Sequence, residues 1–365
     1  MRVLLVAPNP KTESGGIAQW TGHILRYYDK HRSDNLDIFH CCRDNAVTTY
    51  GSDSIFTRLY KAIYNYVPIC RLMKKELKKG DVDVVHICTS ASLSLFLNLY
   101  MINLAHRYNT KVIMHYRFGR IPQLIERNNW ESKMLKKVFG KADGNIVIDS
   151  LSFNSLIAKG YSKCCLLPNP LSPDIPKKVA QLNHKRDNKK VLFVGHVIVT
   201  KGVFELVKAC KDIDGIELEL IGYVDEDVRK ELFKLAGNSP SAWLKIVGIK
   251  DMDYIIKSML TTTVFALPTY TEGFPNVILE SMACACPIVT TPVGAIPEML
   301  DINGENPCGI CVAPKTVRPL KEAVELLMND KMLATKLGRL AQDRVNTLYS
   351  METVWDKMNR IWANL

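Results

Sequence analysis

The sequence lacks the compositional extremes that mark non-globular proteins. No residue type dominates its 365 positions and no repeat or low-complexity tract interrupts them, which excludes collagen-like chains, coiled coils and repeat arrays. Hydrophobic residues make up 47% of the chain and charged residues 23%, which excludes an intrinsically disordered protein. The length predicts two domains, each able to bury its own core.

Segments that would enter or cross a membrane are also missing. Residues 1–8 are too short for the apolar core of a secretory signal, and their pattern predicts a first buried strand. Residues 84–105 contain no Asp, Glu, Lys or Arg, but Ser, Thr and Asn recur among them. A buried strand followed by a buried helix is therefore favoured over a membrane span. We expect a cytoplasmic protein.

Metal-binding patterns are weak in this chain. Its eleven cysteines are odd in number and fall mostly in apolar runs, which indicates reduced thiols in a cytosolic core. Cys308 and Cys311 have zinc-like spacing, but no second pair with that spacing accompanies them. Asp81 and Asp83 form a D-x-D pattern that we interpret as the start of a strand. We expect no metal and no cofactor.

Two familiar nucleotide-binding patterns are absent as well. No G-x-G-x-x-G follows a predicted strand and there is no Walker A loop, which disfavours nicotinamide and P-loop chemistry. No helix-turn-helix, zinc-finger or RNA-binding signature occurs, so we expect no nucleic-acid partner.

Positive charge is concentrated in the first half of the chain. Residues 1–170 have a net charge of +11, whereas residues 171–365 are neutral overall. The densest segment, 55–80, has a net charge of +6 with aromatic and aliphatic residues between the cations, a composition suited to an anionic membrane surface. A solvated face of an ordinary helix pair, divided at Pro68, is the alternative. The cations of this predicted membrane or acceptor face are Arg58, Lys61, Arg71, Lys74, Lys75, Lys78, Lys79, Arg117 and Arg120.

Short apolar strands alternate with helical patterns along the whole chain. The predicted strands are 3–7, 82–88, 111–115, 144–148, 191–194, 217–221, 244–247, 263–267 and 287–290. This alternation predicts an α/β fold with two Rossmann-like, doubly wound parallel-sheet domains facing across a cleft. A proline-rich and then polar separator, 168–190, divides them into domains 1–170 and 171–344. A last helix, about 345–365, is expected to pack back on the first domain.

Three predicted strand-to-helix junctions contain residues that suit a phosphorylated ligand. Gly15 and Gly16 open the first helix and offer bare backbone N–H groups. Lys201 precedes a helix beside a glycine turn and can neutralise a diphosphate. Residues 271–280, TEGFPNVILE, place Glu272 on a loop and Glu280 about one turn into a helix, where its carboxylate can accept ribose hydroxyls.

The segment 271–280 resembles the E-x7-E signature of glycosyltransferase family 4, whose GT-B-fold members transfer sugars from nucleotide donors. Residues 283–298 resemble the family too, as do 193–195 with Lys201 and Gly202. The Gly15–Gly16 pair and the segments 83–86 and 168–170 extend the likeness, in the family's order, over nearly the whole chain.

The resemblance implies a role for each matched residue. Glu280 would hold the donor ribose, Glu272 the sugar hydroxyls, and Lys201 the diphosphate leaving group, whose charge grows in the transition state. His115 resembles the family's histidine near the reacting sugar, so the implied catalytic residues are His115, Lys201 and Glu272. The implied donor-binding residues are Gly15, Gly16, Gly195, His196, Lys201, Ile249, Glu272, Gly273, Phe274, Pro275, Asn276, Val277 and Glu280.

The resemblance also implies the reaction. We expect a retaining, metal-independent hexosyltransferase that moves a sugar from a UDP- or GDP-sugar on the second domain to a glycan or lipid-linked acceptor on the first. Bacterial surface-glycan synthesis at the cytoplasmic face of the inner membrane is the expected setting.

One residue departs from the family pattern. His196 stands where the family usually has arginine, and histidine has only a partial charge at neutral pH. Either His196 is charged beside the phosphate, or Arg117 or Arg120 compensates, or donor binding is impaired. A sugar-nucleotide epimerase or phosphorylase of the same fold, and a non-catalytic nucleotide-sugar-binding protein, remain alternatives.

Overall fold

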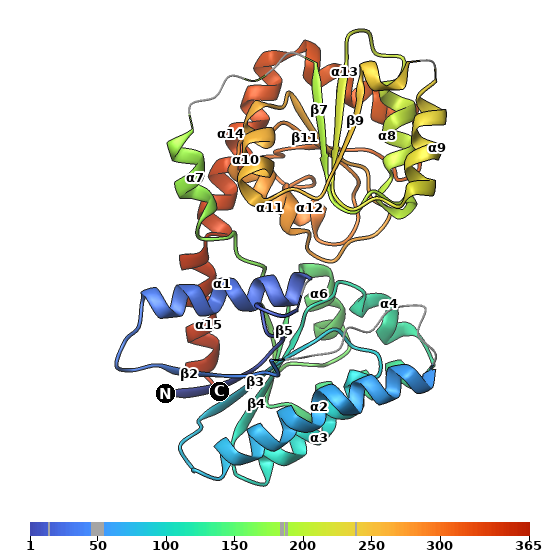
Figure 1. Ribbon diagram of the computed structural model, residues 1–365. Helices are drawn as coiled ribbons and strands as arrows, with labels where there is room; N and C mark the ends of the chain where they lie inside the picture. The colour runs from blue at the N-terminus through green and yellow to red at the C-terminus, as the bar shows by residue number, and fades with distance from the viewer. Residues whose placement is uncertain (14, 45–54, 183–185, 187–188, 238) are drawn as a thin grey trace. The chain divides into compact units, whose positions relative to one another are not determined.

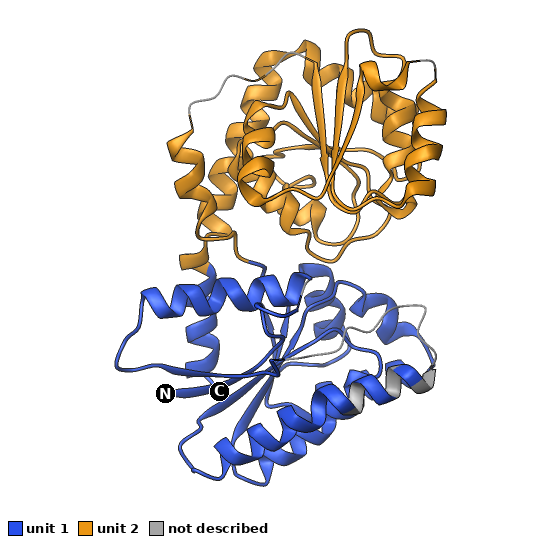
Figure 2. Ribbon diagram, in the orientation of Figure 1, with its two compact units in different colours: residues 1–169, 354–365 blue, residues 170–353 orange. Residues whose placement is uncertain are grey.

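Two parallel β-sheets of six strands each organise the part of the chain that the structure, a computed structural model, describes: residues 1–13, 15–44, 55–182, 186, 189–237 and 239–365 (Figure 1). Unit 1 comprises residues 1–169 and 354–365, and unit 2 comprises residues 170–353 (Figure 2). The predicted α/β class with two doubly wound sheets is confirmed.

Unit 1 is built on a sheet with the strand order β2-β1-β3-β4-β5-β6. Its strands are β1 (Arg2–Val6), β2 (Asp37–Cys41), β3 (Val84–Thr89), β4 (Lys111–Tyr116), β5 (Gly144–Val147) and β6 (Cys164–Leu166). Its helices are α1 (Gly16–Lys30), α2 (Ile55–Leu77), α3 (Ser94–His106), α4 (Ile121–Glu126), α5 (Trp130–Lys141), α6 (Ser150–Ala158) and most of α15 (Met351–Ala363). The switch point of this sheet lies between β1 and β3, because β2 is added on one side of β1 and β3 to β6 follow on the other.

Apolar helices cover both faces of this sheet (Figure 1). Trp20 of α1 and Trp362 of α15 are buried against the face that carries His86. Met73 of α2 and Leu95 of α3 belong to the core on the opposite face, together with alternate residues of β1 and β3. Because both faces are buried, the central strands are nearly continuous apolar runs, and this made them predictable from sequence.

Unit 2 has the strand order β12-β11-β10-β7-β8-β9. Its strands are β7 (Lys190–Val194), β8 (Glu217–Ile221), β9 (Leu244–Gly248), β10 (Val264–Leu267), β11 (Ile288–Thr290) and β12 (Ile310–Cys311). Its helices are α7 (Ile175–Gln181), η1 (Val199–Lys201), α8 (Val203–Cys210), α9 (Glu226–Ala236), η2 (Pro240–Ala242), α10 (Met252–Thr261), α11 (Asn276–Ala283), α12 (Ile296–Met299), α13 (Arg318–Asn329) and α14 (Lys331–Leu348). This is the Rossmann order, with its switch point between β7 and β10.

The predicted break of α2 at Pro68 is wrong, because one helix runs from Ile55 to Leu77. Proline has no N–H, so the carbonyl oxygen of Tyr64, four residues earlier, loses its helical partner. The guanidinium of Arg43 donates a hydrogen bond to that oxygen and lies 3.7 Å from the centroid of the Tyr64 ring. A side chain from outside the helix thus replaces the missing donor.

Other elements of the structure can be compared with the sequence-based predictions. The strands β2, β6 and β12 were not predicted, and each lies at an edge of its sheet. Residues 84–105 form β3 and α3, and no helix in the described ranges combines the length and the hydropathy needed to cross a bilayer. The separator 168–190 contains α7, and part of its polar run lies outside the described residues. Unit 2 continues through α14 to residue 353.

Candidate active site

Loops at the carboxyl edge of the unit 2 sheet carry the predicted donor-binding residues. The loop after β7 leads to Lys201, and the loop after β10 carries Glu272 and leads into α11. In a doubly wound sheet, ligands bind outside the carboxyl ends of the strands that flank the switch point, which here are β7 and β10. The topology therefore places both loops where a ligand is expected.

Lys201 is held by a tight turn between β7 and α8. Gly202, which follows it, has a left-handed backbone with a φ of 71°. A side chain is excluded there, because its Cβ would lie 2.0 Å from the carbonyl oxygen of Pro268. The carbonyl oxygen of Thr200 accepts a hydrogen bond of 2.8 Å from the backbone N–H of Tyr270. The turn thus packs directly against the loop after β10.

Glu272 forms an ion pair with Lys201. Both side chains are largely withdrawn from solvent, with exposed fractions of 13% for Glu272 and 25% for Lys201. The loop after β11 supports this arrangement, since the backbone N–H of Ala295 donates to the carbonyl oxygen of Gly273 at 2.9 Å. Because either charge alone would be costly to desolvate, the pair keeps both side chains in place.

Glu280 lies on α11, in the same loop–helix segment as Glu272. Burial raises the pKa of Glu280 to about 7. Among the described residues no hydrogen-bond donor or opposite charge offsets that effect. A carboxyl group without a protein partner retains its full capacity to accept hydrogen bonds from ligand hydroxyls. The two glutamates are connected by residues 273–279, which include the predicted Phe274, Pro275, Asn276 and Val277. Helix α11 begins at Asn276.

Two further predicted donor-binding residues are exposed near this edge. His196 follows Gly195 at the end of β7, and its ring lies edge-on to that of Tyr223 with 6.4 Å between centroids. Ile249 follows β9, and 74% of its side chain is exposed. Within the described residues, neither forms a hydrogen bond with Lys201 or Glu272.

The remaining predicted residues, Gly15, Gly16 and His115, belong to unit 1. Gly15 has a φ of 105°, and α1 begins at Gly16. Both glycines are exposed, and a Cβ on either would meet no atom within 4 Å. His115 lies near the end of β4 with no exposed surface. Burial lowers its pKa well below the ordinary value, so the imidazole is neutral.

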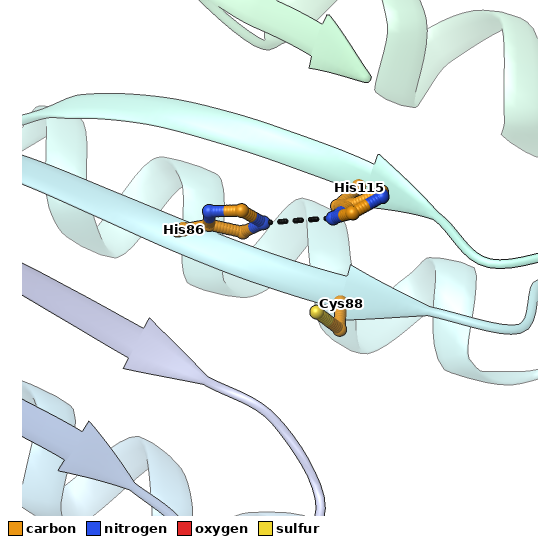
Figure 3. A group of neighbouring side chains, drawn as sticks. All are labelled: His86, Cys88 and His115. Carbon is orange, nitrogen blue, oxygen red and sulfur yellow. Dashed lines mark hydrogen bonds between the residues drawn. The ribbon is translucent and has the colours of Figure 1, made fainter. Parts of the chain in front are cut away.

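His86, Cys88 and His115 form a cluster whose potential ligand atoms all lie within 4.8 Å of one another (Figure 3). A histidine that binds a metal donates its second ring N–H to an acceptor. Here Nδ1 of His86 faces the indole N–H of Trp362 at 3.0 Å, and Nε2 of His115 faces the guanidinium of Arg117 at 3.2 Å. Both neighbours are donors, so the cluster does not fit a metal ion, and we assign none to it.

The cations of the predicted basic face differ in their exposure and in their partners. Lys74, Lys75 and Lys78 on and after α2 are exposed, and Lys79 is exposed while pairing with Glu76 at 2.6 Å. Arg120 pairs with Glu131 at 3.0 Å. The guanidinium carbon of Arg117 lies 4.6 Å from the centroid of the Trp20 ring.

Sequence reasoning missed several residues of both loop regions. Tyr270, whose hydroxyl donates to Glu205 at 2.7 Å, had no local signal. Gly294, which lies against Glu272, falls in the segment 283–298 that resembles the family, but no role was predicted for it. His86 did have one, because it lies in a predicted strand beside the strand that carries His115. Register pairs Cys88 with His115, so the two histidines are diagonal neighbours on one face.

Comparison with known proteins shows that most of unit 2 is similar to a known family. Residues 174–344 match the family described as glycosyl transferases group 1. CapM of Staphylococcus aureus, a capsular polysaccharide biosynthesis glycosyltransferase, is 28% identical over 194 residues, which are 51% of this chain and 49% of CapM. An uncharacterized glycosyltransferase of Methanocaldococcus jannaschii, MJ1178, is 25% identical over 300 residues, covering 75% of this chain and 81% of that protein.

Solved structures show the same fold. The crystal structure of Anabaena Alr3699/HepE in complex with UDP matches with a TM-score of 0.72 and 15% identity, and the match covers 100% of each chain. At this identity the likeness supports the fold alone.

Proposed function

Since residues 174–344 of this chain match the glycosyl transferases group 1, we propose that the protein transfers a sugar from a nucleotide-diphosphate donor bound by unit 2 to an acceptor bound by unit 1. The observation that carries this proposal is the placement of Lys201, Glu272 and Glu280 at the switch point of the unit 2 sheet. Alr3699/HepE, which shares the fold, was crystallised with UDP, and this supports a UDP-sugar as donor.

In this proposal each group of the site meets one part of the donor. The free carboxyl group of Glu280 accepts hydrogen bonds from the ribose hydroxyls. The ammonium group of Lys201 exchanges part of its interaction with Glu272 for the diphosphate, and Glu272 then accepts hydrogen bonds from the sugar. His196 lies exposed at the end of β7, where it can face the same diphosphate.

The proposed reaction is a transfer with retention at the sugar's anomeric carbon. The bond from that carbon to the diphosphate oxygen breaks, and a bond to the acceptor oxygen forms on the same face. The acceptor hydroxyl loses its proton to the departing diphosphate. Lys201 stabilises the negative charge that grows on the diphosphate, an effect worth roughly 3–4 kcal/mol for a well-placed donor.

The acceptor side is proposed to work at a membrane. Aromatic side chains project from helices α2, α3 and α5 of unit 1: Tyr60, Tyr64, Phe96, Tyr100 and Trp130 are between 42% and 67% exposed. The rings of Phe96 and Trp130 stack with 5.8 Å between centroids. Exposed aromatic rings on a unit that also carries a run of exposed lysines suit the interface of an anionic leaflet. We therefore propose a lipid-linked or glycan acceptor of surface-polysaccharide synthesis, met at the cytoplasmic face of the membrane.

Thermal shift against UDP-, GDP- and dTDP-sugars tests donor binding, because a ligand that binds the folded state raises its apparent stability. We expect one nucleotide series to stabilise the wild-type chain, and Glu280→Gln to lose most of that shift. Glu231→Gln, an exposed glutamate on α9, is the control and should retain it.

Product analysis separates transfer from the alternatives. Incubation with the stabilising donor and a membrane extract should yield a glycosylated product and the nucleoside diphosphate. Lys201→Met should lower turnover at least about a hundredfold, whereas Lys208→Met, on the exposed side of α8, should not. An epimerised or hydrolysed donor with no acceptor product would contradict the proposed transfer.

A further inference from the structure

Four side chains of unit 1 connect the carboxy-terminal helix to the end of β4. Trp362 Nε1 lies 3.0 Å from His86 Nδ1, and His86 Nε2 lies 3.1 Å from His115 Nδ1. His115 Nε2 lies 3.2 Å from Arg117 Nη1. Figure 3 shows the two imidazoles facing each other from adjacent strands. Both histidines are fully buried, and only 2% of Trp362 is exposed.

The two ends of this chain of contacts can only donate hydrogen bonds. An indole N–H and a guanidinium have no acceptor atom. Burial lowers the pKa of His86 to about 3 and that of His115 well below its ordinary value, so each imidazole is neutral, with one donor and one acceptor nitrogen. If His86 Nδ1 and His115 Nε2 both accepted hydrogen bonds, His86 Nε2 and His115 Nδ1 would both carry protons and point at each other. Two of the three contacts, at most, are therefore hydrogen bonds at any one time.

The contact without a hydrogen bond is the one at Arg117. Trp362, His86 and His115 are buried together, so two donors facing each other at either of the contacts that join them could not be relieved by water, at a cost of roughly 1–3 kcal/mol. Arg117 is only half-buried, so water can reach part of its side chain and relieve a donor left without an acceptor there. Trp362 thus makes His86 a donor at Nε2, and His86 donates to His115 Nδ1. The proton of His115 is then on Nε2, next to the guanidinium.

Further donors without acceptors surround this point. Nε of Arg117 and Nε1 of Trp20 are buried and have no hydrogen-bond partner among the described residues. The Trp20 ring lies edge-on to His115 with 5.1 Å between centroids and below the guanidinium of Arg117. Among the described residues no carboxylate pairs with Arg117, and burial lowers its pKa to about 10. An uncompensated cation beside several unpaired N–H groups is matched by an anionic ligand.

We propose that Nε2–H of His115 and the guanidinium of Arg117 bind a phosphoryl group of a substrate held by unit 1, and that Trp362, acting through His86, is a positioning residue that keeps His115 a donor. A phosphoryl group fits better than a single carboxylate because its three oxygens can accept from imidazole and guanidinium together. This inference rests on the proposed function only in taking the phosphoryl group as part of a substrate.

The tautomers of His86 and His115 can be measured directly. Long-range proton–nitrogen correlation spectra of the full chain with ¹⁵N-labelled histidine distinguish Nδ1–H from Nε2–H, and His115→Gln assigns the signals. We expect both residues to be neutral with the proton on Nε2 at pH 6 and at pH 7.5. A proton on Nδ1 of His115, or a protonated ring, would overturn the inference whether or not the protein transfers sugar.

Titration with inorganic phosphate tests the binding site. We expect phosphate to shift the Nε2 signal of His115, and Arg117→Gln to weaken that response about tenfold or more. Trp362→Phe should leave His115 as a mixture of tautomers and weaken the response as well. Trp355→Phe is the matched control on the same helix, because its ring packs against Trp362 and Tyr27. No response to phosphate, or an unchanged response in Arg117→Gln, would contradict the proposal.

Two further probes identify the source of the phosphoryl group. A shift of the His115 signal by farnesyl phosphate in the absence of nucleotide assigns it to the acceptor. A shift by UDP alone that Glu280→Gln removes assigns it to the donor. Either result supports an anion site at Arg117. No shift of the His115 signal with phosphate, farnesyl phosphate or UDP would overturn it.

Discussion

A Cβ atom on Gly294 would lie 2.3 Å from the carbonyl oxygen of Glu272. Gly294 has a φ of 58°, in the left-handed region that favours glycine, and it follows β11 in a loop that supports the loop after β10. The position of the Lys201–Glu272 pair therefore depends on a residue that takes no part in the pair.

Replacing Gly294 tests this dependence. Gly294→Ala should lower the free energy of unfolding by about 1–3 kcal/mol through backbone strain, and it should displace Glu272 and lower turnover at least about tenfold. Gly237→Ala is the matched control for backbone strain, since Gly237 has a φ of 88° but a Cβ there would meet no atom of the described residues within 4 Å. Both variants should lose stability in unfolding curves, but only Gly294→Ala should lose turnover, and an equal loss of turnover in both would contradict the role of Gly294.

The raised pKa of Glu280 predicts how stability depends on pH. Its pKa is about 7 in the folded chain against an ordinary value of 4.5, so between these pH values the folded chain retains a proton that the unfolded chain has released. This contribution to stability is present below pH 4.5 and is lost as the pH rises through 7. Urea unfolding should show that Glu280→Gln gains about 2 kcal/mol relative to wild type between pH 5 and pH 8. A parallel pH dependence of the two proteins would contradict the burial of Glu280.

The lysines at the end of α2 should contribute to membrane binding. Changing Lys74, Lys75, Lys78 and Lys79 together to Gln should weaken binding to vesicles with anionic lipid at least about tenfold, because each basic residue near such a surface contributes about 1 kcal/mol. Four exposed lysines of unit 2, Lys208, Lys211, Lys230 and Lys257, provide a control of equal charge. Sedimentation with vesicles should separate the two variants, and identical binding would leave α2 as an ordinary solvated helix.

Arg43 should matter only because Pro68 is present. Arg43→Met should lower the free energy of unfolding by about 1 kcal/mol, since the carbonyl oxygen of Tyr64 loses its donor. In a Pro68→Ala background the alanine N–H can bond to that oxygen, and Arg43→Met should then have little effect. A double-mutant cycle measures this coupling, and additive effects of the two changes would show that Arg43 does not compensate for the proline.

Central strands were predictable from sequence, whereas three of the four edge strands were not; β9, the fourth, was predicted as 244–247. β8 was predicted with the bounds it has, Glu217–Ile221, because a strand with helices on both faces is a nearly continuous apolar run. β2, β6 and β12 lie at sheet edges, and β12 has only two residues. Such strands bury less surface, so their sequences lack the apolar run on which the prediction depends.

Parts of the sites depend on contacts that no local pattern reveals. Glu272, Glu280 and Lys201 could be singled out because each lies at a strand-to-helix junction of recognisable composition. The hydrogen bond from Trp362 to His86 joins residues 276 positions apart. The expectation that a last helix, about 345–365, packs back on the first domain gave no information on the partner of the indole N–H. Only the folded chain shows which apolar residue of that helix also orients a histidine.

A crystal structure of the full chain with UDP would show how the donor is bound. We expect the ribose hydroxyls within hydrogen-bond distance of the Glu280 carboxylate, and the diphosphate within reach of the Lys201 ammonium. A nucleotide bound away from the loops after β7 and β10, with the Lys201–Glu272 pair and Glu280 untouched, would contradict the proposed donor site.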